Sequence, residues 1–180
     1  MKIYNFIICM LFVLILNNAH AQKNLVQNSG FEEEDFYGWN NNGAITTPWD
    51  FKSGKNSCAI ITKDAANWVG IDQSIRIPKN AKALAFSAWL KATNVVKGKD
   101  PWNGAVFSIE FLNGDDKKIG EGINIATITG DQPWGLYKKA ILIPDKAASF
   151  RILLAMGYAS GQMLVDDVSA SVISVDDLGK

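Results

Sequence analysis

Histidine and cysteine are nearly absent from this sequence, and their scarcity excludes several kinds of chemistry. The 180 residues include one histidine, His20, and two cysteines, Cys9 and Cys58. Catalysis by Ser-His-Asp or Cys-His groups needs a base that titrates near neutral pH, which is usually histidine. Zinc sites need clusters of histidine or cysteine. Carboxylate chemistry and metals that prefer oxygen ligands, such as calcium, remain.

Long apolar runs are also lacking, but a short one follows the N-terminus. Lys2 precedes the apolar run Ile7–Leu16, and Ala19-His20-Ala21 supplies the small-x-small pattern that signal peptidase recognises. This order predicts a cleavable signal peptide over residues 1–21, and therefore a secreted or periplasmic protein with no membrane insertion after cleavage. An uncleaved anchor is the weaker alternative, because a bilayer span needs roughly 20 apolar residues.

Net charge is lacking as well. Removal of residues 1–21 takes away Lys2, His20 and Cys9 and leaves 159 residues with 17 basic and 18 acidic side chains. Such a balance gives no electrostatic case for binding nucleic acid or an anionic membrane surface. The remaining length is typical of one domain with a well-buried core. We expect this domain to span residues 22–173 and to be followed by a short polar tail, 174–180.

Alternation of apolar and polar residues is abundant, and no stretch of ten residues predicts an amphipathic helix. Turn signals rich in glycine, proline and asparagine separate the alternating segments. Strands are predicted at Cys58–Thr62, Val69–Ile77, Ala83–Lys91, Ala105–Phe111, Ile123–Ile128, Leu136–Ile143, Ser149–Met156 and Met163–Val172. Short strands at regular spacing predict an all-β, two-sheet antiparallel sandwich.

The longest predicted connection, Thr93–Gly104, ends near Trp102. A long loop in a small domain is often functional. Trp102 is therefore either a ligand contact or a lid folded onto the edge of the sandwich.

A second unusual feature is the pair Asp166-Asp167 inside a predicted strand. One of two adjacent strand residues points inward, where an unpaired carboxylate is costly. Without histidine or cysteine nearby, a calcium ion is the natural partner for the buried carboxylate.

Several segments together resemble a known family. The opening Asn24–Glu32 (N-L-V-Q-N-S-G-F-E), followed by Gly38-Trp39, and the closing Met163–Ser169 (M-L-V-D-D-V-S) resemble motifs of the carbohydrate-binding modules grouped as families four, nine and twenty-two. Weaker matches lie between them, in order, at Gly54–Ser57, Phe86–Ala92 and Pro133–Tyr137. The resemblance covers nearly the whole mature chain and implies a jelly-roll, galactose-binding-domain-like fold.

The resemblance also implies a structural calcium that ties the first strand to the last. Its ligands would fall on Glu32, on Asp166 and on backbone carbonyls of the turn from Gly54 to Asn56. The ion would serve stability rather than catalysis, and it would account for the buried carboxylate.

The family's saccharide-binding cleft lies across the concave sheet, where aromatic rings stack on sugar rings. The resemblance and the strand alternation together nominate six ligand-binding residues: Trp68, Arg151, Asp72, Trp102, Glu110 and Trp89. The alternation places Ile71 and Gln73 inward and Asp72 outward, and it assigns Trp89 to the same face as Glu110. The ordinary alternatives are that Trp89 packs in the structure and that Arg151 pairs with Glu110 or Asp72.

Three functions remain open. The first is a secreted, non-catalytic protein that binds a poly- or oligosaccharide, with other exported glycan-processing proteins as possible further partners. The second is a structural or adhesive protein of the same fold without sugar binding. The third is a small hydrolase or lyase, which would need Asp72 and Glu110 to face each other across a cleft.

Overall fold

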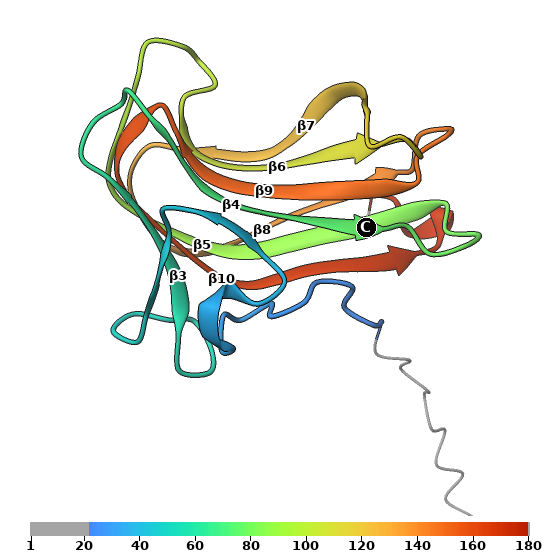
Figure 1. Ribbon diagram of the computed structural model, residues 1–180, viewed down its shortest axis with the longest axis horizontal. Helices are drawn as coiled ribbons and strands as arrows, with labels where there is room; N and C mark the ends of the chain where they lie inside the picture. Colours follow the sequence, from blue (N-terminus) through green and yellow to red (C-terminus); the bar gives the residue numbers. More distant parts are fainter. Residues whose placement is uncertain (1–21, 180) are drawn as a thin grey trace, which may run out of the picture.

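Two antiparallel sheets of five strands pack face to face around one apolar core (Figure 1). The computed structural model describes residues 22–179, so the predicted signal peptide lies outside the described residues. The strands are β1 (Asn40–Asn42), β2 (Ile45–Thr47), β3 (Ser57–Thr62), β4 (Trp68–Arg76), β5 (Ala83–Lys97), β6 (Gly104–Leu112), β7 (Lys118–Ile128), β8 (Gly130–Leu142), β9 (Ser149–Gly157) and β10 (Ala159–Ile173). Sheet A has the order β1-β4-β9-β6-β7, and sheet B has the order β2-β3-β10-β5-β8.

The predicted all-β sandwich is confirmed as a jelly roll. Within residues 22–179 the only helices are two short 3-10 turns, Glu34–Phe36 and Val175–Asp177. No helix in this part of the chain is long and apolar enough to cross a membrane. Strands β3 to β10 match the eight predicted segments, although their ends differ. The three-residue strands β1 and β2 were missed because so short a segment carries no visible alternation.

The predicted long loop Thr93–Gly104 is wrong in extent. A bulge between Ala92 and Val95 shifts the register of β5 against β8, and the strand then continues to Lys97. Val95 is buried, so the extension is anchored in the core. The true connection between β5 and β6 covers only residues 98–103.

The core is filled by the inward residues of both sheets. Phe86 of sheet B meets Phe150 of sheet A edge to face, with ring centroids 5.1 Å apart. Phe107, Ile109 and Leu154 are fully buried in the same layer. Each such side chain contributes roughly 1.5–3 kcal/mol through burial. The strict alternation fixes the register of each strand, because a slip of one residue would expose its apolar set.

A polar residue on the inward face of β4 does not break this pattern. Gln73 is buried, and its amide forms two hydrogen bonds with the backbone of Gln27. The Gln27 N–H donates to Gln73 Oε1 at 2.9 Å, and Gln73 Nε2 donates to the Gln27 carbonyl at 3.1 Å. The predicted register, with Ile71 and Gln73 inward and Asp72 outward, is therefore correct.

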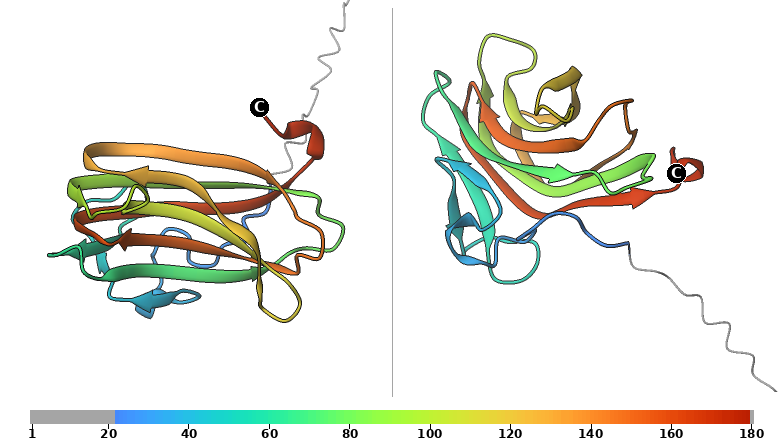
Figure 2. Two further views of the ribbon diagram at one scale, coloured as in Figure 1. Left: turned by 90° about the horizontal axis from the view of Figure 1, so that it is seen from above. Right: turned by 45° about the vertical axis from the view of Figure 1, so that its right-hand side comes forward.

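The N-terminal segment runs beside β10 (Figure 2). The Leu25 N–H donates to the Ala170 carbonyl, and the Val168 N–H donates to the Ser29 carbonyl. The side chain of Asn24 adds two hydrogen bonds, to the Val168 carbonyl and from the Ala170 N–H, both at 3.0 Å. These contacts join the two ends of the domain, which lie more than 140 residues apart in sequence.

Candidate functional site

An open cleft of about 840 Å³ lies on the outer face of sheet A. Val106 and Ser108 of β6 and Asn124 and Thr127 of β7 form its floor. These residues point outward because their neighbours Phe107, Ile109 and Ala126 occupy the core. The cleft therefore offers an apolar patch beside hydroxyl and amide groups.

Aromatic side chains line one end of the cleft. Trp68 opens β4, Trp102 lies in the loop between β5 and β6, and Tyr158 follows β9. The Trp68 ring lies beside Gly157, where a Cβ would come within 3.8 Å of Trp68 Cδ1. Trp102 and Tyr158 keep 65% and 49% of their surface exposed, so their rings are accessible to a ligand.

The loop that carries Trp102 is held in place by hydrogen bonds. The Gly98 N–H donates to the Tyr158 carbonyl at 2.9 Å, and the Asp100 N–H donates to Asn103 Oδ1 at 2.9 Å. A Cβ at Gly98 would lie 2.5 Å from the Tyr158 carbonyl oxygen, so this approach requires glycine. With 65% of its surface exposed, Trp102 is not folded down as a lid onto the edge of the sandwich. It lines the cleft, and its role as a ligand contact stays a prediction.

A charged cluster borders the cleft. Arg151 donates to Glu110 Oε2 from Nε at 3.1 Å and from Nη2 at 2.5 Å, and Lys118 Nζ lies 3.3 Å from Glu110 Oε1. Lys118 itself lines the cleft, and a Cβ at Gly122 would meet Lys118 Nζ and Glu110 Cγ at 3.8 Å each. The predicted alternative that Arg151 pairs with Glu110 is thus present in the structure.

The electrostatics of this cluster keep Glu110 ionised. Burial by itself raises the pKa of Glu110, but hydrogen bonds and charge from Arg151 and Lys118 outweigh that effect. The net result is a pKa below the usual value of 4.5. Glu110 therefore holds no proton to donate at neutral pH.

Asp72 lies on the same outer face but outside the cleft. Its Oδ2 accepts a hydrogen bond of 2.9 Å from Asn40 Nδ2 on the neighbouring strand β1. On the other side Asp72 is paired with Leu153 of β9, whereas Glu110 is paired with Arg151, two residues earlier in the same strand. Strand β9 thus separates Asp72 from Glu110, and the two carboxylates do not face each other.

Trp89 does not share a face with Glu110, and this prediction is wrong. Trp89 belongs to β5 of sheet B, whereas Glu110 belongs to β6 of sheet A. The ring lies on the outer side of sheet B, with Lys52 Nζ 4.1 Å from its centroid. The alternation had correctly placed Trp89 outward, but a period of two does not reveal which sheet a strand joins.

Asp166 is the buried carboxylate of the predicted pair, but the prediction that it points inward is wrong. It lies opposite Trp89 in the register of β10 and β5, on the outer side of sheet B, and is covered by the loop that carries Lys52 and Ser53. Its Oδ2 accepts hydrogen bonds from the Lys52 and Ser53 N–H groups at 2.7 and 3.0 Å, and its Oδ1 accepts from the Asp167 N–H at 2.7 Å. Burial raises the pKa of Asp166, and these three hydrogen bonds oppose the shift without cancelling it. Asp167 points outward and accepts from Ser53 Oγ at 2.7 Å.

Glu32 binds the same loop from the N-terminal side. Its Oε1 accepts from the Lys55 and Asn56 N–H groups at 2.8 and 3.1 Å. Gly54 has a φ of +67°, and a Cβ there would collide with Glu32 Oε1, so glycine is required. Loop 52–56 is therefore clamped between Glu32 and Asp166, and we call this arrangement the carboxylate clamp.

The carboxylate clamp offers oxygen atoms, the kind of ligand that calcium prefers. A Cβ at Gly30 would lie 3.6 Å from Asp166 Oδ1 and 3.8 Å from Asp167 Oδ1, so these two carboxylates lie close to the N-terminal segment. Within residues 22–179 no three acidic, histidine or cysteine side chains form a metal cluster. Backbone carbonyls would have to complete the coordination, as predicted for the turn from Gly54 to Asn56.

Sequence reasoning missed Tyr158 and Lys118 as cleft residues. Tyr158 follows Gly157 at the end of a predicted strand, and its φ of 49° turns the chain out of the sheet there. Its position after a strand-terminal glycine was the only available signal. Lys118 lies outside the predicted strand Ile123–Ile128, and only the pairing of β6 with the longer β7 brings it beside Glu110.

Solved structures of similar fold include modules described as saccharide-binding. The CBM22-1 xylan-binding domain of Paenibacillus barcinonensis Xyn10C is 20% identical, with a TM-score of 0.58 over 86% of this chain and 97% of that domain. TmCBM61, described in complex with β-1,4-galactotriose, is 13% identical, with a TM-score of 0.56 over 84% of this chain and 99% of that one.

A larger protein also contains the fold. The enzymatically active domain of tailspike protein 4 from bacteriophage CBA120 is 17% identical, with a TM-score of 0.64 over 83% of this chain. This chain spans 21% of the length of that tailspike structure. No protein-family sequence model matches the chain, and no curated protein matches it significantly in sequence. The fold is that of jelly-roll carbohydrate-binding modules, as the sequence motifs predicted.

Proposed function

We propose that this chain is a non-catalytic carbohydrate-binding protein and that the cleft on sheet A holds a poly- or oligosaccharide. The observation that carries the proposal is the grouping of Trp68, Trp102 and Tyr158 at one end of the cleft. A pyranose presents C–H groups on its faces and hydroxyls around its rim. Aromatic rings offer apolar contact to those faces, while Ser108 and Asn124 on the floor offer hydrogen bonds to the rim.

Binding is favoured over hydrolysis by the state of the carboxylates. Glycoside hydrolysis generally uses two facing carboxyl groups, one of which has a raised pKa and donates a proton. Glu110 is instead held ionised by Arg151 and Lys118, and β9 separates it from Asp72. Arg151, Glu110 and Lys118 would act as a fixed polar border that contacts hydroxyls of a bound chain.

The structural or adhesive alternative is less well supported. A protein that kept this fold without sugar binding would not need an open cleft with exposed tryptophan and tyrosine side chains. The cleft of about 840 Å³ and the exposure of Trp102 therefore favour the saccharide-binding function.

We further propose that the protein is exported through its signal peptide and binds one structural calcium ion at the carboxylate clamp. Glu32 and Asp166 would hold the ion together with carbonyls of Gly54 and Asn56, and the ion would neutralise charge on the buried carboxylate. Other exported glycan-processing proteins would be the natural partners of a binding domain without catalytic groups. Chelation by EDTA should lower the melting temperature, and added calcium should restore it. An identical melting curve in EDTA and in calcium would rule out the ion.

Electrophoresis in native gels that contain a soluble polysaccharide tests saccharide binding. The panel should include arabinoxylan, β-1,4-galactan, galactomannan and mixed-linkage β-glucan. At least one should retard the wild type, and Trp68→Ala or Trp102→Ala should weaken that binding roughly tenfold. This estimate assumes that about 60 Å² of apolar ring surface is buried by the sugar, at about 25 cal/mol per Å².

The matched control is Tyr37→Ala. Tyr37 is an aromatic residue with 58% of its surface exposed, and it does not line the cleft. The control should bind as tightly as the wild type. If all three variants lost polysaccharide binding to the same extent, the cleft would not be the saccharide-binding site.

A further inference from the structure

The outer face of sheet B carries an exposed aromatic surface that the cleft does not explain. Trp49 keeps 89% of its surface exposed, more than any other large apolar residue in the described part of the chain. It lies in the segment between β2 and β3 that folds over sheet B. Leu136 on β8 is 47% exposed on the same face, opposite Trp89 in the register of β5 and β8. Exposed aromatic and apolar side chains on one face of a sheet are candidates for an interaction surface.

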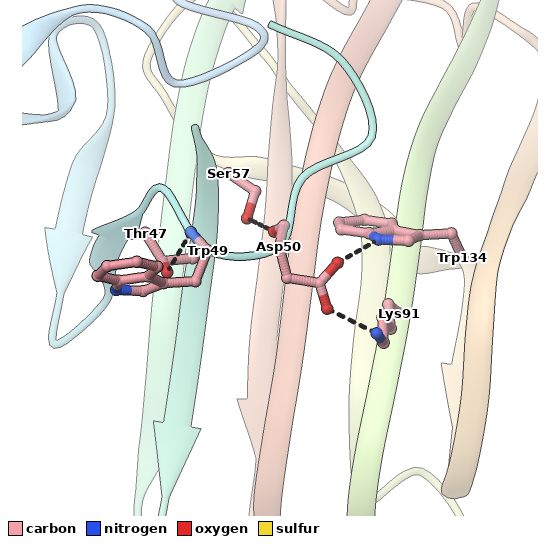
Figure 3. Close-up of polar contacts among 6 residues, drawn as sticks. All are labelled: Thr47, Trp49, Asp50, Ser57, Lys91 and Trp134. Atoms are coloured by element: carbon pink, nitrogen blue, oxygen red, sulfur yellow. Dashed lines mark hydrogen bonds and ion pairs between the residues drawn. The ribbon is translucent and has the colours of Figure 1, made fainter. Parts of the chain in front are cut away.

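An ion pair lies at the centre of this surface. Asp50 Oδ2 is 2.6 Å from Lys91 Nζ, and Asp50 Oδ1 accepts a hydrogen bond of 2.8 Å from Trp134 Nε1. Figure 3 shows Trp49 and Trp134 on either side of Asp50, with Lys91 below the carboxylate. About a third of each charged side chain remains exposed, 32% for Lys91 and 39% for Asp50.

Hydrogen bonds hold the backbone of the segment that carries Trp49 and Asp50. The Asp50 carbonyl accepts from Ser57 Oγ at 2.7 Å, and the Trp49 N–H donates to Thr47 Oγ1 at 3.4 Å (Figure 3). The next residues of the loop are held by Asp166, which accepts from the N–H groups of Lys52 and Ser53. Because the backbone of this loop is already ordered, ligand binding carries no further cost for ordering the loop.

We propose that Trp49, Asp50, Lys91 and Trp134 form a second saccharide-binding surface, on the side of the sandwich opposite the cleft. The two indole rings would contact sugar faces, while the carboxylate oxygens and the ammonium group would bind hydroxyls between them. The pair is neutral overall, which suits an uncharged glycan. A protein partner fits less well, because the centres of protein interfaces are depleted of charged residues.

Two binding surfaces on opposite faces would let one molecule bridge two polysaccharide chains. Simultaneous attachment raises the apparent affinity for a polymer without any new contact. This consequence rests on the proposed function of the cleft, whereas the outer surface itself does not. The two surfaces share no residue, so variants can separate them.

The test is the same polysaccharide gel, run with variants of each surface and a control. The cleft variant carries Trp68→Ala and Trp102→Ala, the outer variant carries Trp49→Ala and Trp134→Ala, and a third protein combines all four substitutions. The control is Leu142→Ala, which removes an exposed apolar side chain from the far end of β8. Because Trp134 is partly buried, Trp49→Ala is also measured alone and in the cleft-variant background, and circular dichroism checks that each variant is folded.

We expect the polysaccharide to retard the cleft variant less than the wild type and to leave the combined variant unretarded. Trp49→Ala in the cleft-variant background should lower the remaining affinity roughly tenfold. A cleft variant that no polysaccharide retards, although the wild type is retarded, would overturn the second surface and leave the cleft in place. Loss of binding in the outer variant, with the cleft variant like wild type, would overturn the cleft function instead. No retardation of the wild type would refute both. A wild-type dimer that Trp49→Ala converts to a monomer would show that this face binds a second copy of the chain, which also overturns the proposal.

Discussion

Replacement of Asp166 by asparagine should strongly destabilise the domain. The buried carboxylate accepts three backbone N–H groups, two from loop 52–53 at Oδ2 and one from Asp167 at Oδ1. Asparagine has the same shape but only one oxygen. At least one N–H donor would then face an NH₂ group and lose its acceptor.

The magnitude follows from these contacts. A hydrogen bond to a charged group contributes about 1.5–3 kcal/mol, and a neutral one about 0.5–1.5 kcal/mol. Asp166→Asn loses one bond and weakens two, but removal of the charge also relieves the desolvation that raises the pKa of Asp166 and outweighs its hydrogen bonds. The cost that remains is that of a buried N–H donor without an acceptor, about 2 kcal/mol, which corresponds to a fall in Tm of roughly 4–8 °C for a domain of this size.

Thermal unfolding followed by circular dichroism in EDTA measures the effect without any contribution from bound metal. The matched control is Asp167→Asn, since Asp167 points outward and its φ of 48° is one that asparagine tolerates. The control should change Tm by no more than about 2 °C. If Asp166→Asn is as stable as the control, the reasoning that the clamp holds loop 52–56 is refuted.

Two further predictions concern the ionisable groups. Because the pKa of Glu110 is lower in the folded state than its ordinary value of 4.5, ionised Glu110 stabilises the fold above that pH, and the stabilisation is lost as the pH falls below it. The Tm difference between wild type and Glu110→Gln should therefore shrink from pH 7 to pH 3, and a constant difference would contradict the role given to Arg151 and Lys118. Burial raises the pKa of the Cys58 thiol, so a maleimide should label Cys58 only after unfolding in guanidinium chloride. Rapid labelling of the native protein would mean that β3 is not packed as described.

Much of the fold was accessible from sequence because alternation directly records which side of a strand is buried. Ile71, Gln73 and Asp72 were assigned to the correct faces, and so were Arg151 and Glu110. These assignments depend only on local geometry. Asp166 is buried, as the family resemblance implied, but it is covered by loop 52–53 on the outer side of sheet B rather than pointing into the core.

The features that were predicted wrongly or missed depend on contacts between segments that are distant in the sequence. The sheet to which Trp89 belongs is decided by strand pairing, which no local pattern records. Lys118 reaches Glu110 only because β6 pairs with β7. The partnership of Asp50 with Lys91 and Trp134 joins residues 41 and 84 positions apart, and it gave no signal in the sequence.

Calorimetric titration with the polysaccharide that most retards the wild type in gels tests the central claim most directly. Saccharide binding in the cleft predicts a Kd for Trp102→Ala that is roughly tenfold higher than that of the wild type, with Tyr37→Ala unchanged. Absence of measurable heat and of gel retardation with every polysaccharide tested, from a protein shown to be folded, would contradict it.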